Sequence, residues 1–267
     1  MSKTDAPAAQ RRAGEIVART LGMLRNAAVP GVSGIELDRQ AEALIRSHGG
    51  VPAFKGYRGF PASVCLSVNA QVVHGIPTDQ PLADGDLASF DVGAQVDGYY
   101  ADAALTVGVG NIPADAARLL AVTEEALGIA LGEARDGRTT GDLGAAVDAY
   151  VKEQGFAVVR DCVGHGIGTK LHEEPSIPNF GKKGKGSRFS TGMVVAIEPM
   201  VVAGNPRLEI AADHWTLSTA DGSLAAHAEE TVVITDGAPI RLTPATLRLS
   251  GENPGARLRK ATPGESR

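Results

Sequence analysis

The sequence predicts an α+β fold with a mostly antiparallel, curved sheet. Three observations lead to this prediction: helix-like segments come in pairs, each pair precedes strand-like segments, and several of those strands are joined by short turns. The 267 residues suit one large domain or two small ones, at roughly 150 residues per domain. Hydrophobic residues at 43% and charged residues at 21% exclude a wholly disordered or collagen-like chain.

Four segments carry apolar residues at helical spacing. Pro30 and Gly31 end the first segment, and Asp136 and Gly137 end the third, because proline and glycine stop helices. The predicted helices are residues 9–28, 35–48, 113–135 and 141–154.

The two helix pairs are similar in sequence, which predicts two similar halves, at about 9–112 and 113–241. The alternative is that any two amphipathic helices with a Ser or Thr cap and a closing Gly look alike. With an offset of 106 residues, Gly31, Ser33, Glu36, Leu37, Ala43, Ile45, Arg46 and Gly49 fall on Gly137, Thr139, Asp142, Leu143, Ala149, Val151, Lys152 and Gly155.

Apolar runs between and after the helices predict the strands. Asp97 and Gly98 separate the second and third runs and predict a two-residue hairpin, in which Val96 pairs with Tyr99. The runs are residues 64–68, 87–96, 99–107, 157–159, 193–202, 208–210, 214–218 and 231–235.

The end of the chain differs from the rest. Residues 1–241 are predicted to form a single domain, and residues 242–267 a disordered basic tail that contains Pro and Gly and lacks apolar periodicity. From Arg241 onward the net charge is +4, which leaves −9 for the preceding residues. A ribosome contact through this tail is one interpretation of its charge.

The two cysteines form no CxxC pair and are too few for a disulfide framework. The N-terminus lacks the apolar segment of a secretory signal, and no stretch of about 18 uncharged apolar residues occurs. We therefore expect a cytoplasmic protein that binds neither membranes nor specific nucleic acids, and that is a monomer.

Acidic residues interrupt the apolar strands at Asp91, Asp102 and Glu198, and Glu229 directly precedes another strand. An isolated ionised carboxylate in the interior has a prohibitive free energy, so each needs a cation or a proton. Since the hairpin places Gly93 opposite Asp102, Asp91 lies diagonal to Asp102 on the same face, with Cα atoms about 7 to 8 Å apart. Both carboxylates can then converge on a metal ion; two solvent-facing acids on an edge hairpin are the alternative.

His165 lies among glycines, which let the backbone approach closely whatever its ring contacts. One imidazole with several carboxylates is an oxygen-rich ligand set that suits Mn, Fe or Co. The zincin, serine hydrolase and dinucleotide-binding motifs HExxH, GxSxG and GxGxxG are absent from the sequence.

Five segments of the sequence share an order and spacing with a known family: residues 56–77, 84–106, 164–180, 193–200 and 227–235. Together they resemble the type I methionine aminopeptidases, which are pita-bread metallopeptidases. The resemblance covers about residues 9–240 and implies a pita-bread fold, with pseudo-twofold halves around a central metal site. It implies removal of the initiator methionine from nascent chains whose second residue is small.

The resemblance also implies a site for two divalent ions, which would be Co, Mn, Fe or Zn. Asp91 would bind one ion, His165 and Glu198 the other, and Asp102 and Glu229 would bridge them. Such ions activate a shared water for attack on the first peptide bond, and Glu198 would move its proton.

Two histidines and an apolar pocket complete the implied site. His172 would hydrogen-bond the carbonyl oxygen as it gains charge, and His74 would contact the scissile amide nitrogen. The methionine side chain would enter a pocket formed by Tyr57, Phe60, Cys65, Leu171 and Trp215.

Three residues depart from the family pattern. The resemblance therefore does not predict the metal affinity, the catalytic rate or the shape of the methionine pocket. Arg58 and Glu230 stand where histidine is usual, and Leu171 where an aromatic residue is usual. Glu230 adds a negative charge next to Glu229, and only one of the two can face the site from a strand. The alternative functions are an Xaa-Pro peptidase of the same fold and a catalytically silent peptide-binding module.

Overall fold

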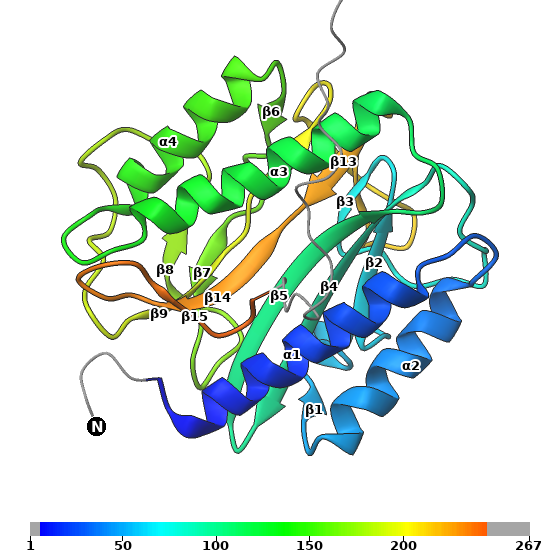
Figure 1. The fold of residues 1–267 in the computed structure, drawn as a ribbon, viewed down its shortest axis with the longest axis horizontal. Coiled ribbons are helices and arrows are strands. Elements are labelled where there is room, and N and C mark those ends of the chain that lie inside the picture. The colour runs from blue at the N-terminus through cyan, green and yellow to red at the C-terminus, as the bar shows by residue number, and fades with distance from the viewer. Residues whose placement is uncertain (1–5, 245–267) are drawn as a thin grey trace, which may run out of the picture.

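Two pairs of helices cover one face of a large antiparallel sheet in the computed structural model, which describes residues 6–244 (Figure 1). Each helix of the second pair begins and ends 106 residues after its counterpart in the first pair. The offset seen in the sequence of one helix and its flanks therefore holds for the bounds of all four helices. They are α1 (Ala8–Ala27), α2 (Gly34–Ser47), α3 (Ala114–Glu133) and α4 (Thr140–Glu153).

The second helix of each pair begins in the same way. The side chains of Ser33 and Thr139 cap α2 and α4 by accepting the backbone N–H three residues further on, at 3.3 and 3.1 Å. Gly31 and Gly137 precede these caps with φ of 94° and 83°, a left-handed conformation that favours glycine. Equivalent sequence signals thus produce equivalent turns in the two halves.

All the strand pairings within residues 6–244 are antiparallel, as predicted. The large sheet follows the order β1 (Val51–Pro52), β4 (Leu87–Val96), β5 (Tyr99–Gly108), β14 (Glu229–Val233), β9 (Val194–Ile197), β7 (Gly164–Gly166) and β8 (Glu173–Ile177), with β2 (Val64–Val68) beside β4 and β15 (Ile240–Arg241) beside β14. Two small sheets contain β13 (Ala225–His227), β10 (Met200–Val202) and β6 (Ala157–Val158), and β11 (Leu208–Ile210), β12 (Leu217–Thr219) and β3 (Gln71–Val73).

The β4–β5 hairpin has the predicted register, with Val96 opposite Tyr99 and Gly93 opposite Asp102. Because side chains alternate along a strand, the register decides which side chains face the helices. Phe90 and its same-face neighbours on β4 and β5 pack into the core beneath α1 and α2. Asp102 and Asp91, whose side chains alternate with these, therefore lie on the opposite face.

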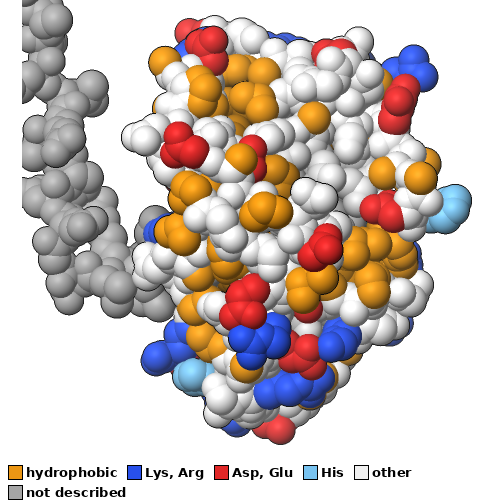
Figure 2. Space-filling model, turned by 90° about the vertical axis from the view of Figure 1, so that its right-hand side faces the viewer, with side chains coloured by type: hydrophobic (Ala, Val, Ile, Leu, Met, Phe, Trp, Pro, Cys, Tyr) orange, Lys and Arg blue, Asp and Glu red, His pale blue; other side chains and the backbone are white. Residues whose placement is uncertain are grey.

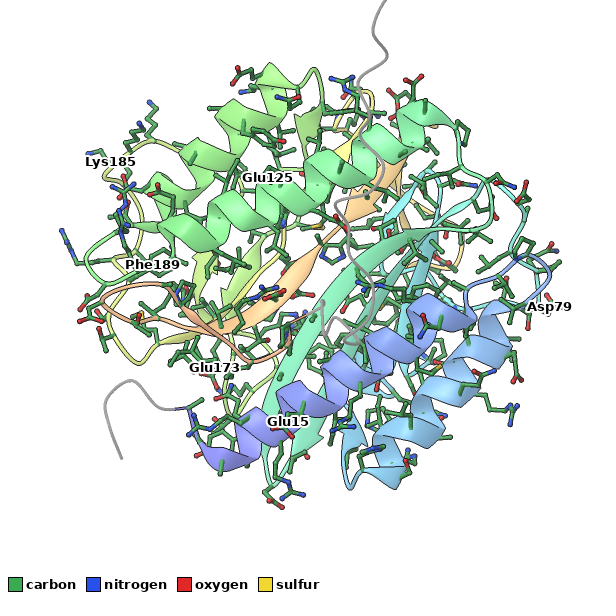
Figure 3. All side chains as sticks on the ribbon, in the orientation of Figure 1. Glu15, Asp79, Glu125, Glu173, Lys185 and Phe189 are labelled. Carbon is green, nitrogen blue, oxygen red and sulfur yellow. The ribbon has the colours of Figure 1, made fainter. Side chains whose placement is uncertain are left out.

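Each helix pair covers its own apolar core. Leu21 and Leu37 belong to the core of the first half, and Leu119 and Leu143 to that of the second. The acidic side chains Glu15 on α1 and Glu125 on α3 lie on the outer, solvent-facing side of their helices (Figure 3). The helices thus occupy one side of the sheet and leave the other side for the site.

One predicted strand divides in two. The run 193–202 forms β9 and β10, which belong to different sheets, because Glu198 and Pro199 separate them. Proline has no backbone N–H with which to continue a ladder. Two other predicted strands, β12 and β14, begin two to three residues away from their predicted starts. Six short strands were not predicted, because two to five residues show no clear alternation. They are β1, β3, β7, β8, β13 and β15.

The folded packing extends beyond the predicted domain boundary at residue 241. Leu242 is buried and donates its N–H to the carbonyl of Thr231 at 2.9 Å, and the N–H of Thr231 donates to the hydroxyl of Thr243 at 2.8 Å. Leu242 and Thr243 therefore belong to the folded body and not to a disordered tail. The remaining tail prediction concerns residues 245–267, which lie outside the described residues.

The side of the molecule on which α2 lies carries acidic and basic side chains intermingled at its lower end (Figure 2). Ion pairs on and beside α2 join Arg39 to Glu36, and join both Arg46 and Lys55 to Glu42. Charges of both signs therefore offset each other here, unlike the basic stripe typical of nucleic-acid binding. No helix within residues 6–244 has the length and apolar composition needed to cross a membrane.

Candidate active site

A cavity of about 360 Å³ lies on the face of the sheet that carries the buried acids. Every residue that the sequence and the resemblance assigned to the site lines this cavity, although these residues come from distant parts of the chain. They are Tyr57, Phe60, Cys65, His74, Asp91, Asp102, His165, Leu171, His172, Glu198, Trp215 and Glu229.

Three of the acids come from three neighbouring strands. Asp91 on β4 and Glu229 on β14 both lie opposite Ala104 on β5, one from each side. Asp102 lies two residues before Ala104 and hence on the same face of β5. Because Ala104 has a small side chain, space remains between the three carboxylates.

His165 lies on the short strand β7, between β8 and β9. A Cβ at Gly164 would lie 2.5 Å from the carbonyl oxygen of Ala196, and one at Gly166 would lie 2.3 Å from that of Glu174. Only glycine fits at these two positions, so the expected close approach of the backbone around His165 is present.

Hydrogen bonding orients the His165 ring. Its Nδ1 donates to the carbonyl oxygen of Gly166 at 3.0 Å, which leaves Nε2 as the free ligand atom. Nε2 lies 3.5 Å from Oδ2 of Asp102 and 3.6 Å from Oε1 of Glu198. Ligand atoms of Asp102, His165 and Glu229 lie within 4.8 Å of one another.

The acids lie in a strongly unfavourable environment for negative charge. Burial, reinforced by the neighbouring carboxylates, raises the pKa values of Asp91, Glu198 and Glu229 well above their ordinary range. Oδ1 of Asp91 is buried and has no hydrogen-bond partner in the described structure. No lysine or arginine among residues 6–244 forms an ion pair with these three acids or with Asp102.

The donor set fits divalent cations. Four carboxylates and one imidazole without a basic partner are hard ligands, which manganese, iron and cobalt accept. Bound cations would supply the positive charge that the surrounding chain lacks, and would give the free Oδ1 of Asp91 a partner.

Two supporting residues were missed by the sequence analysis. Oγ1 of Thr231 on β14 lies 2.7 Å from the carbonyl oxygen and 3.1 Å from Oδ1 of Asp102, and accepts the Asp102 N–H. Nε2 of His227 lies 3.6 Å from Oε2 of Glu198, and burial, together with His74, lowers the pKa of His227 to about 3. His227 thus provides a neutral imidazole beside Glu198. Its place two residues before Glu229 was the only sign of this in the sequence.

The apolar end of the cavity is formed by one side-chain cluster. The rings of Phe60 and Trp215 meet edge to face, with centroids 5.2 Å apart, and Leu171 and Tyr57 belong to the same cluster. Cys65 on β2 lies opposite Asp91 on β4, so the apolar pocket adjoins the carboxylates directly. Burial raises the pKa of the Cys65 thiol well above its usual range, which keeps this wall uncharged.

Two further histidines lie at the cavity edge. Nδ1 of His172 lies 3.0 Å from the Tyr57 hydroxyl, and its ring centroid lies 4.3 Å from that of His165. Partial burial, followed by the nearby His165 and Arg58, lowers the pKa of His172 to about 4. His74 has a left-handed backbone conformation, with φ of 60°.

The turns that carry these histidines are held by local contacts. The carboxylate of Glu173 (Figure 3) accepts the N–H of Lys170 at 2.8 Å, which closes the turn that contains His172. After His74, a Cβ at Gly75 would lie 2.0 Å from the carbonyl oxygen of Leu66, so only glycine fits there. The backbone thus holds both rings at the edge of the cavity.

Glu230 does not add a charge to the cavity. Alternation on β14 turns Glu229 toward the cavity and Glu230 toward the other face, where the Glu230 side chain is 1% exposed and hydrogen-bonds Arg241 through both carboxylate oxygens. The expectation of a negative charge beside the metal ligands is therefore corrected: Glu229 is the glutamate available to the site, and Arg241 offsets the charge of Glu230.

The profile of metallopeptidase family M24 matches residues 8–236. The chain therefore belongs to metallopeptidase family M24.

Its relatives within that family are methionine aminopeptidases. The methionine aminopeptidase of Clostridium perfringens is 49% identical over 234 residues, which cover 87% of this chain and 94% of that protein. Methionine aminopeptidase 1 of Bacillus subtilis is 49% identical over 226 residues, covering 85% and 91%. The crystal structure of methionine aminopeptidase from Thermotoga maritima matches with a TM-score of 0.88 at 39% identity, and covers 91% of this chain and 99% of that one. The predicted resemblance to type I methionine aminopeptidases, and with it the pita-bread fold, is confirmed.

Prolidases share the fold at a lower level of similarity. The prolidase from Pyrococcus furiosus is 23% identical with a TM-score of 0.72, and this chain covers 65% of that protein. At this identity the likeness shows the fold alone. The chain covers only 65% of the prolidase, which is therefore the longer protein, but it covers 99% of the Thermotoga maritima methionine aminopeptidase.

Proposed function

We propose that this chain removes the N-terminal methionine from peptides and nascent proteins whose second residue is small. The observation that carries this proposal is the single cavity in which a carboxylate–histidine cluster adjoins an apolar pocket. Relatives named methionine aminopeptidase, 49% identical over most of the chain, support the same reaction.

The carboxylate–histidine cluster would hold two divalent ions. We assign Asp91 to one ion, His165 and Glu198 to the other, and Asp102 and Glu229 to both; Co, Mn, Fe and Zn are the candidate metals. When bound there, divalent ions would lower the pKa of a bound water molecule and polarise the scissile carbonyl. Thr231 holds the Asp102 carboxylate, and the hydrogen bond from Nδ1 to Gly166 holds the His165 ring in its ligating orientation.

Glu198 is the acid–base residue in this proposal. Its carboxylate lies at the cavity wall between His165 and His227, whose Nε2 atoms lie 3.6 Å from Oε1 and Oε2 respectively. Glu198 takes the proton of the attacking water and passes it to the leaving amine. Its backbone is held by Asn179, whose side-chain amide donates to the Glu198 carbonyl at 2.9 Å.

His172 donates to the substrate carbonyl oxygen as that oxygen gains charge. The Tyr57 hydroxyl, 3.0 Å from Nδ1, donates to this nitrogen and leaves the ring proton on Nε2. A pKa lowered to about 4 keeps His172 neutral at pH 7. His74 contacts the amide nitrogen of the bond that is cleaved.

The apolar pocket receives the methionine side chain. An unbranched thioether packs well against aromatic and sulfur-containing walls, such as those formed by Phe60, Trp215 and Cys65. Leu171 in this cluster provides an aliphatic wall.

We further propose that the protein acts on nascent chains in the cytoplasm as a monomer. Both cysteines are free thiols, which supports a reducing compartment. A ribosome contact through the basic residues beyond Arg241 stays a prediction about residues outside the described range.

Cleavage of three peptides tests the function. The full chain is stripped with EDTA, titrated with Mn²⁺, Co²⁺, Fe²⁺ or Zn²⁺, and assayed on Met-Ala-Ser, Met-Leu-Ser and Ala-Pro-Ser. We expect metal-dependent release of methionine from Met-Ala-Ser and little from Met-Leu-Ser. Cleavage of Ala-Pro-Ser without cleavage of Met-Ala-Ser would favour an Xaa-Pro peptidase, and peptide binding without any turnover would favour a silent binding module.

A further inference from the structure

We infer that Arg58 is a specificity residue that binds a carboxylate on the peptide substrate beyond the scissile bond. This inference rests on the proposed function, because it concerns the part of the peptide that follows the cleaved residue.

Arg58 carries a positive charge at the edge of a cavity that is lined by several carboxylates. Among the described residues, it is the only lysine or arginine that lines the cavity, against five acids, namely Asp91, Asp102, Asp161, Glu198 and Glu229. Arg58 is exposed and forms no ion pair within residues 6–244. Its guanidinium is therefore available to a ligand that enters the cavity.

The backbone of Arg58 has an unfavourable conformation. Arg58 has φ of 50° and ψ of 21°, and it lies between Gly56 and Gly59, which have φ of 87° and 92°. This left-handed region disfavours an arginine, whereas glycine and asparagine adopt it readily. Strained residues persist mainly where the surrounding structure and a function require them. The turn places the one strained residue of this segment at the cavity edge.

Contacts through the Tyr57 side chain place Arg58 next to the reacting end of the site. The guanidinium carbon lies 5.4 Å from the centroid of the Tyr57 ring, and the Tyr57 hydroxyl lies 3.0 Å from Nδ1 of His172. His172 is the residue proposed to contact the scissile carbonyl. A peptide whose first side chain fills the apolar pocket therefore continues past Arg58.

The chemistry of the guanidinium selects the ligand. Stacking on an aromatic ring leaves the edge of the guanidinium free, and its fork of donors matches a carboxylate with two parallel hydrogen bonds. Because the second residue of the substrate is small, the carboxylate belongs to the third side chain or to the C-terminus of a short peptide.

Three peptides separate these two sources. Met-Ala-Asp-Ala-amide carries the acid on its third residue, Met-Ala-Ala carries a free C-terminal carboxylate, and Met-Ala-Ala-Ala-amide is neutral beyond its N-terminus. For the metal-loaded wild-type protein we expect each acidic peptide to have a kcat/KM about two- to five-fold above the neutral one, the size of one exposed ion pair. The preference should reside in KM and weaken in 0.5 M NaCl, because salt screens an exposed pair.

The variant R58Q keeps the length of the side chain and removes its charge. We expect the ratio of acidic to neutral kcat/KM to fall to about one or below, and R58K to retain part of the preference. R19Q is the matched control, since Arg19 is an exposed arginine on the outer side of α1 and does not line the cavity. Circular dichroism checks that each variant is folded.

An acidic-to-neutral ratio in R58Q equal to that of the wild-type protein overturns the inference. Loss of the preference in R58Q for only one acidic peptide assigns the contact to that carboxylate. Wild-type protein that cleaves none of the three peptides contradicts the proposed function instead. The dissociation constants of the same peptides, measured by calorimetry on wild-type and R58Q proteins, then still test the Arg58 contact.

Discussion

Asp91 and Glu229 lie opposite the same residue, Ala104, from the two sides of strand β5. The β4–β5 hairpin sets the first pairing and the return of the chain at β14 sets the second, although 138 residues separate the two acids along the chain. The backbone hydrogen bonds of β5 with β4 and β14 fix both residues, so the two acids stay together even though negative charges on them would repel. The sheet thus brings the two carboxylates together in the arrangement that the proposed cation site requires.

Removal of His165 should abolish metal binding at one position without unfolding the chain. In His165→Ala, we expect bound Mn²⁺ to fall and turnover to be lost, since His165 supplies the nitrogen in the cluster that it forms with Asp102 and Glu229, whose ligand atoms lie within 4.8 Å of one another. The strands that carry the site are held by their own ladders, so the circular dichroism spectrum should persist. Calorimetric Mn²⁺ titration checks this, with His48→Ala, an exposed residue on the C-cap of α2, as the control. Normal titration of His165→Ala would exclude His165 as a ligand.

Loss of the His172 donor should reduce the rate but leave the metals in place. In His172→Ala, we expect kcat to fall by about 10² to 10³, the range for one oxyanion donor. Tyr57→Phe removes the hydroxyl that lies 3.0 Å from Nδ1, and should reduce kcat by a smaller factor, about 10-fold. Steady-state kinetics with saturating metal measure both. An unchanged kcat in His172→Ala would show that this role is wrong.

The ion pair between Glu230 and Arg241 should contribute to stability. In Arg241→Met, a cation partner of the buried Glu230 carboxylate is removed, so we expect the free energy of unfolding to fall by about 1 to 3 kcal/mol. Arg241 is 41% exposed, which keeps the effect below that of a fully buried pair. Urea denaturation measures it. The double variant Glu230→Gln with Arg241→Met should recover part of the loss, and a double variant as unstable as the sum of the singles would contradict a direct pairing.

The metal-free protein should lose stability as pH rises. The pKa values of Asp91, Glu198 and Glu229 are raised in the folded chain, so the folded state binds more protons than the unfolded state. Stability therefore falls as pH increases from about 4, the unfolded value, through the raised values. Divalent ions must displace these protons, so their affinity rises over the same range.

Thermal unfolding measures this linkage. The increase in Tm caused by 1 mM Mn²⁺ should be larger at pH 7.5 than at pH 5.5, relative to samples in EDTA. An equal increase at both pH values would mean that the bound ions do not replace protons on these carboxylates. His165→Ala serves as the control, since its Tm should respond weakly to the metal at both pH values.

The elements predicted best from the sequence were those with strong local signals. The four helices are fourteen to twenty residues long and each has an apolar face. The turn at Asp97 and Gly98 alone set a register of ten residue pairs, which placed Asp91 diagonal to Asp102. The short strands escaped prediction because their ladders depend on partners far along the chain. β7, for instance, is three residues long and pairs with β8 and β9.

The candidate site was predictable only in part for the same reason. Acids within apolar strands signalled metal binding, and the family resemblance supplied the histidines and the pocket. The contacts of Thr231 with Asp102 and of His227 with Glu198 required the fold, because 129 and 29 residues separate these pairs. The opposite orientations of Glu229 and Glu230 followed from strand alternation, but the partner Arg241 was visible only in the structure.

We propose that five side chains together bind two divalent ions in the cavity: Asp91, Asp102, His165, Glu198 and Glu229. Crystals of the protein loaded with Mn²⁺, measured at a wavelength at which manganese scatters anomalously, test it most directly. We expect two anomalous peaks between these side chains. Peaks located elsewhere, or five side chains that turn away from an empty cavity in a metal-saturated crystal, would contradict it.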